Sequence, residues 1–329
     1  MKLASLGTTR DGELVVVNRE LTRYSKVEGV STLQDALDQW EQSREVLQYF
    51  SNEVNKPTGG IPFNAKECRA PLPRAYQWID GSAYLSHMYR IRKSRGAEMP
   101  KSFEVDPLVY QGGSDDFLGA CDDAVFGDSA WGIDLEAEVA VVVSDVPMGT
   151  TAEQVIRYGY IKLVMLANDW SLRHLIADEV SKGFGFFQGK PSTSFSPVAV
   201  TPDELGLAWN GRCFSGRLQV EINDQPIGTL GAGIDLQFDF PRLIEHCAKS
   251  RNLRAGTIIG SGTVSNHDPA AGVGCIAEMR ALEKLSGQVD LTNFLKHGDR
   301  VAIDCLNDAG SIFGRIDQTV RIRHKFSET

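Results

Sequence analysis

Hydrophobic residues in this chain occur mainly in short runs that are typical of buried β-strands. Seven such segments lie between residues 135 and 306: LEAEVAVVV, YIKLVMLAND, FSPVAVT, RLQVEIND, GTIIGSGTVS, GCIAEMR and RVAIDCL. Between these segments, only AEQVIRY and FPRLIEHCAKS show the spacing of long helices. The pattern therefore predicts a mixed, predominantly β fold with a few peripheral helices.

The first 65 residues form a smaller unit with its own pattern. KLASLG and ELVVVN predict two strands joined by the turn TRDGE. Apolar residues then recur at helical spacing, from a cap at Ser31 or Thr32 to about Ser51. A stretch rich in proline and glycine, NKPTGGIPFNAKECRAPLPRA, follows. We therefore predict a small N-terminal α+β module with its linker at residues 1–65 and a main domain at residues 66–329.

Composition and charge narrow the classes of partner. The 329 residues carry a net charge of −9, and no run of Lys or Arg alternates with aromatics, so we expect no nucleic-acid partner. The six cysteines are scattered singly, without the spacing of a zinc site or a disulfide framework. The N-terminus lacks the apolar segment of a secretory signal, and no apolar run approaches the roughly 18 residues of a membrane span. We expect a cytoplasmic protein with reduced thiols and no membrane partner.

The stretch GIDLEAEVAVVV places Glu136 and Glu138 two residues apart in a predicted strand. Residues at this spacing point to the same side, so the two carboxylates lie close together. Two like charges raise each other's pKa, and burying either carboxylate without a partner costs several kcal/mol. A hard cation such as Mg²⁺ or Ca²⁺ would remove this cost. The alternative is an edge strand whose second face is wet, with both glutamates solvated.

Two further aspartates lie where they could join these glutamates. Asp169 ends the apolar run IKLVMLAND, and Asp80 follows aromatic and aliphatic residues in YQWIDGS. Four carboxylates with added waters suit an octahedral divalent ion, and an all-oxygen set disfavours zinc. The alternatives are an Asp-Gly turn at Asp80 and a helix N-cap at Asp169, because SLRHLIADE after it has a helical pattern.

Three other polar residues are candidates for chemistry. His87 lies seven residues after Asp80 among apolar and aromatic residues, where it is either a hydrogen-bonded core residue or a base oriented by a carboxylate. Glu278 in GCIAEMRAL could be that carboxylate, or it could face solvent. Lys190 is the only lysine in a glycine-rich stretch without a nearby charge, which suits an electrophilic role.

Taken in order, these segments resemble the fumarylacetoacetate hydrolase family. The resemblance rests on Asp80 with His87 seven residues later, on DLEAEVAVVV, and on NDWSLR at residues 168–173. It continues with GKPSTSFSP, with GTVS from Gly262, with Glu278 in the strand predicted to follow, and with LKHGDRV. It covers roughly residues 66 to 325, and the ordered set is far more specific than any one motif.

The resemblance implies a fold, a metal site and roles for particular residues. The fold would be the β-roll or sandwich of the fumarylacetoacetase C-terminal domain, so that residues 66–329 are a metal-dependent catalytic domain. The implied ligands of Mg²⁺, Ca²⁺ or Mn²⁺ are Asp80, Glu136, Glu138 and Asp169. His87 with Glu278 is the implied water-activating dyad, and the implied contacts to substrate or leaving group are Lys190, Tyr110 and Thr263.

The activity implied by the resemblance is hydrolysis of the C–C bond of a 1,3-diketo acid by a homodimer. Fumarylacetoacetate, an intermediate of tyrosine and phenylalanine catabolism, is the expected substrate, and fumarate and acetoacetate are the products. Two departures concern substrate recognition. Ile176 stands where the family commonly has Gln, and any of Arg90, Arg92 and Arg95 could bind substrate.

These departures leave alternatives open. Within the family they are an acylpyruvate hydrolase and an oxaloacetate decarboxylase or keto-acid tautomerase. Outside it, the alternative is a non-catalytic binding protein stabilised by a metal. Such a protein has no need of the His87 and Glu278 pair, so replacing His87 by Ala would change no activity.

Overall fold

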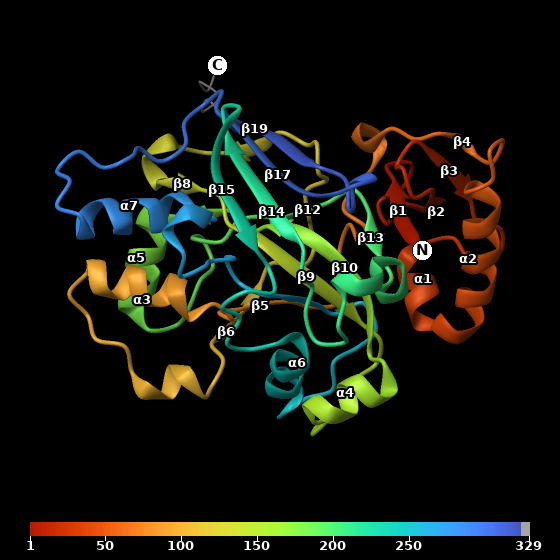
Figure 1. Ribbon diagram of the computed structural model, residues 1–329, viewed down its shortest axis with the longest axis horizontal. Coiled ribbons are helices and arrows are strands. Elements are labelled where there is room, and N and C mark those ends of the chain that lie inside the picture. Colours follow the sequence, from red (N-terminus) through yellow and green to blue (C-terminus); the bar gives the residue numbers. More distant parts are fainter. Residues whose placement is uncertain (324–329) are drawn as a thin grey trace, which may run out of the picture.

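Eleven strands form one large sheet in the computed structural model, which describes residues 1–323 (Figure 1). The strand order is β4-β3-β2-β1-β13-β10-β9-β16-β5-β6, and β12 also pairs with β10. Their bounds are β1 Lys2–Leu6, β2 Glu13–Val17, β3 Arg23–Lys26, β4 Ile61–Pro62, β5 Trp78–Gly81, β6 Val109–Gly112, β9 Ala137–Val143, β10 Ile161–Asn168, β12 Ser194–Phe195, β13 Ala199–Val200 and β16 Ile258–Gly260.

The N-terminal strands extend this sheet at one edge, because β1 pairs antiparallel with β13. The two strands expected from KLASLG and ELVVVN are confirmed as β1 and β2. The boundary at residue 65 stays a prediction, and the last six positions of the predicted main domain, 324–329, lie outside the described residues.

A second sheet of six strands packs across the first, in the order β15-β14-β17-β19-β7 with β18 beside β17. A two-strand pair, β8 with β11, completes the β-structure of residues 1–323. Their bounds are β7 Ala124–Phe126, β8 Ile133–Asp134, β11 Ser171–Leu172, β14 Arg217–Ile222, β15 Gln225–Gly231, β17 Arg300–Asn307, β18 Gly310–Ser311 and β19 Ile316–Ile322. This mixed fold with a small N-terminal domain confirms the predicted fold class.

Seven α-helices lie within the described part of the chain: α1 Leu33–Asp38, α2 Trp40–Val54, α3 Leu85–Ser94, α4 Ala152–Tyr158, α5 Arg173–Lys182, α6 Phe240–Ala248 and α7 Ile276–Leu285. The helices α3, α5 and α7 gather at one end of the molecule, where α3 packs against α7 (Figure 1). Helices α4 and α6 confirm the two predicted from sequence. The prediction that these were the only long ones was wrong, because α3, α5 and α7 have 10 residues each.

Two local predictions also need correction. The helix expected from residue 32 to about 51 does begin after Thr32, but it breaks at Gln39, whose φ of −129° is not helical. The segment GCIAEMR is not a strand, because Ile276 begins helix α7. Its continuation ALEKL is rich in strong helix formers, which a short apolar window does not include.

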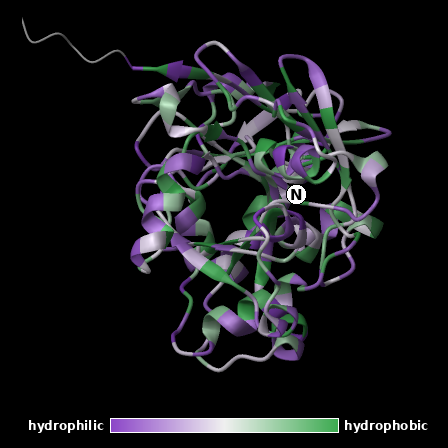
Figure 2. Ribbon diagram, turned by 90° about the vertical axis from the view of Figure 1, so that its left-hand side faces the viewer, coloured by the Kyte–Doolittle hydropathy of each residue, from purple (hydrophilic) through white to green (hydrophobic). Residues whose placement is uncertain are grey.

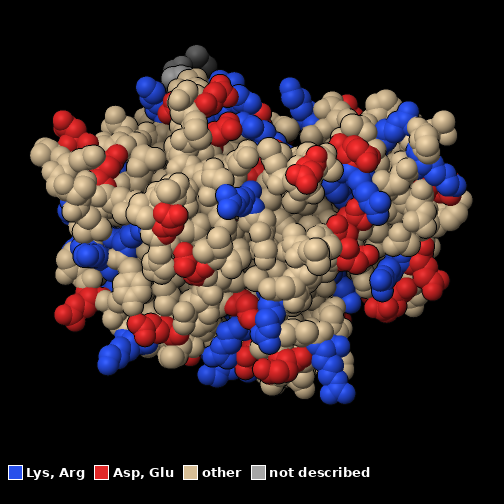
Figure 3. Space-filling view, viewed as in Figure 1, with Lys and Arg blue, Asp and Glu red and all other residues tan. Residues whose placement is uncertain are grey.

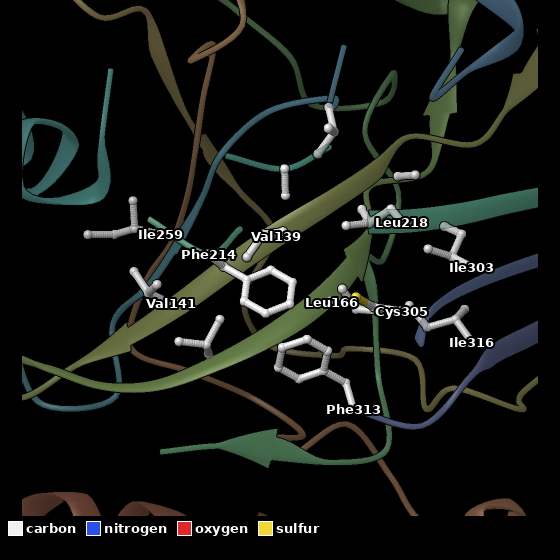
Figure 4. Packing of buried hydrophobic residues seen from close by; sticks show 14 of the residues in the cluster. Val139, Val141, Leu166, Phe214, Leu218, Ile259, Ile303, Cys305, Phe313 and Ile316 are labelled. Carbon is white, nitrogen blue, oxygen red and sulfur yellow. The ribbon is translucent and has the colours of Figure 1, made fainter. Parts of the chain in front are cut away.

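Strand β9 shows why the central segments are continuously apolar. It lies between β10 and β16, and both of its faces are buried. Val139 and Val141 face the core between the two sheets, with Leu218 of the second sheet (Figure 4). Ala140 and Val142 face the opposite cluster, which includes residues of α1. Because β9 is not an edge strand and both of its faces are buried, Glu138 is not a solvated residue of an edge strand.

The surface is of mixed charge. Figure 2 shows hydrophobic residues along interior strands and hydrophilic residues on many outer loops. On the face shown in Figure 3, Lys and Arg are interspersed with Asp and Glu and form no continuous basic surface. Among the described residues, no helix is long and apolar enough to cross a membrane.

Candidate active site

A pocket of about 460 Å³ opens between α3, α5 and the ends of β5 and β6. Six of the nine residues predicted from sequence line it: Asp80, His87, Tyr110, Glu136, Lys190 and Thr263. The other three, Glu138, Asp169 and Glu278, are buried and contact or approach these lining residues. The structure therefore brings all nine predicted residues to one place.

Three carboxylates converge from three strands of the large sheet, of which β10 and β9 are adjacent and β5 is separated from β9 by β16. Asp80 lies in β5, Glu138 lies in β9, and Asp169 directly follows β10. Each offers a ligand oxygen, and these three oxygens lie within 4.8 Å of one another. Asp80 is therefore a strand residue rather than an Asp-Gly turn, and α5 has its N-cap at Leu172 rather than at Asp169.

The carboxylate of Glu138 has no partner of its own. Its side chain is fully buried, and neither oxygen has a hydrogen-bond partner among the described residues. Burial, together with the carboxylates of Asp80 and Asp169, raises the pKa of Glu138 well above its ordinary value. Burial and the Asp169 carboxylate also raise the pKa of Asp80, to about 8. Such a group is costly unless a cation pairs with it.

The backbone leaves room for a cation beside these oxygens. A Cβ atom on Gly260 would lie 2.3 Å from Oδ1 of Asp80 and 3.1 Å from Oε2 of Glu138, so only glycine fits there. The backbone N–H of Gly262 donates to Oδ1 of Asp80 at 3.0 Å. The unpartnered oxygens and the all-oxygen donor set fit a hard divalent cation such as Mg²⁺, Ca²⁺ or Mn²⁺.

Glu136, the fourth predicted ligand, lies beside the other three and is paired with cations of the chain. Its Oε1 accepts from Nη2 of Arg173 at 2.9 Å, and its Oε2 accepts from Nζ of Lys190 at 2.5 Å. Burial alone would raise the pKa of Glu136, but these two cations outweigh it and hold the pKa below its ordinary value. Its role as a metal ligand stays a prediction.

Lys190 joins Glu136 to the group of three carboxylates. Its Nζ also donates to Oδ2 of Asp169 at 2.5 Å, and the hydroxyl of Tyr110 donates to the same oxygen at 2.5 Å. In sequence Lys190 has no charged neighbour, but the fold supplies two. Burial would lower the pKa of Lys190, yet Asp169 and Glu136 raise it above its ordinary value, so the ammonium stays charged.

The predicted dyad is formed across two packed helices. His87 lies in α3, and Glu278 lies in α7 rather than in the predicted strand. Nδ1 of His87 lies 3.0 Å from Oε2 of Glu278. Oε1 of Glu278 accepts from the guanidinium of Arg90 and, at 2.7 Å, from the hydroxyl of Ser265. Burial would raise the pKa of Glu278, but these donors and His87 outweigh it and lower the pKa.

The three arginines after His87 separate into two roles. Arg90 also donates to the carbonyl oxygen of Asn266 at 2.7 Å, so its guanidinium holds Glu278. Arg92 and Arg95 line the pocket. Arg92 donates through Nε to the carbonyl oxygen of Glu98 at 2.8 Å. Of the three arginines, Arg92 in α3 and Arg95 at its C-cap are therefore the two that line the pocket.

Asp134 and Arg173 were not assigned a role from sequence, although both stand in the motifs DLEAE and NDWSLR. Asp134 is fully buried and accepts from the backbone N–H groups of Ile276 and Ala277, at 2.8 and 2.9 Å. Nε of Arg173 donates to Asp134 at 2.8 Å. Asp134 thus fixes the start of α7, which carries Glu278, to the strand segment that carries the acidic residues. The sequence signal for both residues was a charged side chain within a motif that already carried candidate site residues.

The far wall of the pocket is apolar. Ile176 and Val180 lie one helical turn apart on α5, and Phe186 packs edge-on against Tyr110. Met88 and Ile91 of α3 line the pocket as well. The pocket therefore combines a charged floor with an apolar wall.

Comparison with known proteins identifies the group to which this architecture belongs. Residues 77–321 match the family described as Fumarylacetoacetate (FAA) hydrolase C-terminal, and residues 1–74 match Fumarylacetoacetase N-terminal domain 2. The chain belongs to the fumarylacetoacetate hydrolase family. This confirms the resemblance inferred from the motifs.

Individual members of the family are distant in sequence. The chain is 26% identical over 209 residues to a fumarylacetoacetase of Arabidopsis thaliana, a match that covers 55% of this chain and about half (49%) of that relative. It superposes on a probable 2-hydroxyhepta-2,4-diene-1,7-dioate isomerase of Mycobacterium abscessus with a TM-score of 0.68, 18% identity, and coverage of 99% of this chain and 100% of that one.

A further structural relative was solved with ligands. It is a maleylpyruvate hydrolase of Sphingobium sp. SYK-6 in complex with manganese(II) and pyruvate, with a TM-score of 0.65, 15% identity, and coverage of 98% of this chain and 100% of that one. At these identities the superpositions establish the shared fold.

Proposed function

We propose that the chain catalyses metal-dependent hydrolysis of the C–C bond of a 1,3-diketo acid, with fumarylacetoacetate as the first candidate substrate. One observation carries the proposal: the His87–Glu278 pair and the carboxylates Asp80, Glu138 and Asp169 border the same pocket. A purely structural ion site would need no oriented imidazole. The family match supports an enzyme, and the Mn²⁺-bound hydrolase relative supports a divalent ion.

The chain's own residues have distinct tasks in this reaction. Glu278 accepts a hydrogen bond from Nδ1–H of His87, which leaves Nε2 free to take a proton from water. The hydroxide equivalent adds to one carbonyl carbon, the C–C bond breaks, and the departing carbon leaves as an enolate that is then protonated. The ammonium of Lys190 can stabilise charge on an oxygen near Asp169. When bound, the divalent cation supplies Lewis-acid stabilisation of the substrate oxygens.

The residues that would hold the cation are Asp80, Glu138 and Asp169, with Glu136 beside them. Tyr110 and Thr263 line the pocket where they can contact substrate or leaving group. Arg92 and Arg95, which also line the pocket, can pair with a substrate carboxylate. We also propose a homodimer, which light scattering of the purified protein would test.

The test is the loss of the enol-diketone absorbance of fumarylacetoacetate, with and without Mg²⁺. We expect rapid, Mg²⁺-dependent loss by the wild type and about 10³-fold slower loss by His87→Ala, a typical effect of removing a general base. His267→Ala is the matched control, because His267 is exposed and does not line the pocket. Equal rates in the wild type and His87→Ala would contradict the proposed dyad.

A second candidate substrate is an acylpyruvate with an apolar acyl group. The apolar wall of Ile176, Val180 and Phe186 favours it, because burying a hydrocarbon tail there stabilises the bound state. A second carboxylate would lose its hydration at the same place, which weakens binding. Comparing kcat/KM for an alkanoylpyruvate and for fumarylacetoacetate distinguishes the two. Oxaloacetate in the same assay tests for the decarboxylase or tautomerase alternative.

A further inference from the structure

Cys275 lies directly beside the His87–Glu278 pair and takes no part in the hydrolysis proposed above. It is the N-cap residue of α7, and its Sγ accepts a hydrogen bond from the backbone N–H of Glu278 at 3.4 Å. His87, Cys275 and Glu278 each offer one potential ligand atom, and these atoms lie within 4.8 Å of one another. Ser, Thr, Asp and Asn are the usual N-caps, so a thiol here adds a soft donor that the cap does not require.

This donor set differs in chemistry from the three carboxylates. It combines an imidazole nitrogen, a sulfur and a carboxylate oxygen, which is a set that zinc prefers, whereas Asp80, Glu138 and Asp169 offer only hard oxygens. Zinc bonds of about 2.0–2.3 Å hold tetrahedral ligands a little more than 3 Å apart. The separation of 3.0 Å between Nδ1 of His87 and Oε2 of Glu278 already approaches this spacing.

We propose that His87, Cys275 and Glu278 form a second cation site that is selective for thiophilic divalent ions such as Zn²⁺ and Cd²⁺, and that its occupation inhibits the enzyme. His87 is the point of entry, because it lines the pocket while Cys275 and Glu278 are buried behind it. A water from the pocket can take the fourth position. Arg90 and Ser265 continue to hold Oε1 of Glu278, which leaves Oε2 for the ion.

The protons balance in this binding step. The thiol of Cys275 loses its proton to solvent as the S–metal bond forms, since a coordinating thiol is deprotonated. The imidazole gives up its Nδ1 proton and carries one on Nε2 instead, so Nε2 can no longer accept a proton from water. Without the ion, burial raises the pKa of Cys275 well above its ordinary value, and the neutral thiol leaves the pair undisturbed.

The experiment uses the full chain with saturating Mg²⁺ and compares the wild type with Cys275→Ser. Serine is a favoured N-cap that can accept the same backbone hydrogen bond, so we expect α7 and basal turnover to be retained. Zn²⁺ should inhibit the wild type, and about 100-fold more Zn²⁺ should be needed for Cys275→Ser, since even outer-shell changes cost 10–100-fold in metal affinity. Cys213→Ser, at a half-buried cysteine away from the pocket, should behave as the wild type.

A second readout needs no turnover. Cd²⁺ should give a sulfur-to-metal charge-transfer absorbance in the wild type and in Cys213→Ser, and this band should be missing in Cys275→Ser. Equal Zn²⁺ inhibition of all three proteins, relieved by raising Mg²⁺, would place zinc at the carboxylates and overturn the proposal. A Cd²⁺ band that survives in Cys275→Ser would overturn it as well. Because this band does not depend on substrate, its outcome is independent of the proposed hydrolysis.

Discussion

Glu138 and Glu278 are both fully buried glutamates beside one pocket, but their surroundings shift their pKa values in opposite directions. Glu278 is bound by Arg90, Ser265 and His87, and its pKa is lowered despite burial. Glu138 has no hydrogen-bond partner among the described residues, and its pKa is raised. The protein thus stabilises the charge of Glu278 itself, whereas the charge of Glu138 requires an ion from outside.

Neutralising each glutamate in turn should give the largest difference in stability between the two sites. Glu278→Gln leaves the partly buried guanidinium of Arg90 without its counter-charge, so we expect a loss of about 3 kcal/mol in the free energy of unfolding. Glu138→Gln replaces a buried carboxyl group that has no hydrogen-bond partner among the described residues, so the metal-free variant should be at least as stable as the metal-free wild type. Urea unfolding with a chelator present measures both. Equal losses in the two variants would contradict the contrast.

The stabilisation of the fold by added Mg²⁺ should depend on Glu138 and not on Glu278. Saturating Mg²⁺ at about 100 times its Kd should stabilise the wild type by about 2.7 kcal/mol, because it binds only the folded state. The same addition should stabilise Glu278→Gln equally and leave Glu138→Gln unchanged. The measurement is the Tm with Mg²⁺ and with a chelator. A Tm of Glu138→Gln that rises as much as that of the wild type would place the ion elsewhere.

A smaller effect is expected from Asp134, which joins the two regions. Asp134→Asn weakens the bonds to Arg173 and to the start of α7, so Glu278 should be held less well. Losing charge-assisted hydrogen bonds of about 1.5 kcal/mol corresponds to about a tenfold lower kcat. Asp128→Asn, which alters an exposed N-cap outside the pocket, is the control. A lower kcat with unchanged Mg²⁺ affinity would show that the loss concerns the dyad.

The smallest effect is expected at acid pH, in the stability difference between the wild type and Glu278→Gln. The folded pKa of Glu278 is lowered, so its stabilising contribution is complete above the unfolded pKa of about 4.3 and is lost as pH falls through the folded value. The stability difference between the wild type and Glu278→Gln should therefore narrow below about pH 4. Unfolding free energies across this range measure it. A difference that widens as pH falls would have the wrong sign.

Sequence predicted which residues gather at the candidate site better than it predicted the elements that carry them. The strands behind Glu138 and Asp169 have both faces buried, so their apolar runs were unambiguous. Helices α3 and α7 were missed, because they carry the polar residues His87, Arg90 and Glu278 on faces that are buried by packing rather than by hydrophobicity. Pairings between distant segments, such as Arg90 with Glu278, have no local signature in sequence.

The paired glutamates Glu136 and Glu138 have different surroundings, which their spacing in sequence does not show. Spacing alone placed Glu136 and Glu138 on one side of a strand, but β9 begins at Ala137, between them. Glu136 therefore meets Arg173 and Lys190, which come from later segments of the chain. A single strand pattern cannot show which carboxylate the fold will pair with a cation of its own.

Calorimetric titration of Mg²⁺ or Mn²⁺ into the wild type, Glu138→Gln and Glu278→Gln measures directly which of the two buried glutamates the ion needs. We expect Glu138, whose carboxylate has no hydrogen-bond partner among the described residues, to hold the ion together with Asp80 and Asp169, while the partnered Glu278 orients the base. This assignment predicts binding with similar affinity to the wild type and to Glu278→Gln, and loss of binding in Glu138→Gln. Loss of binding in Glu278→Gln with full binding in Glu138→Gln would contradict it.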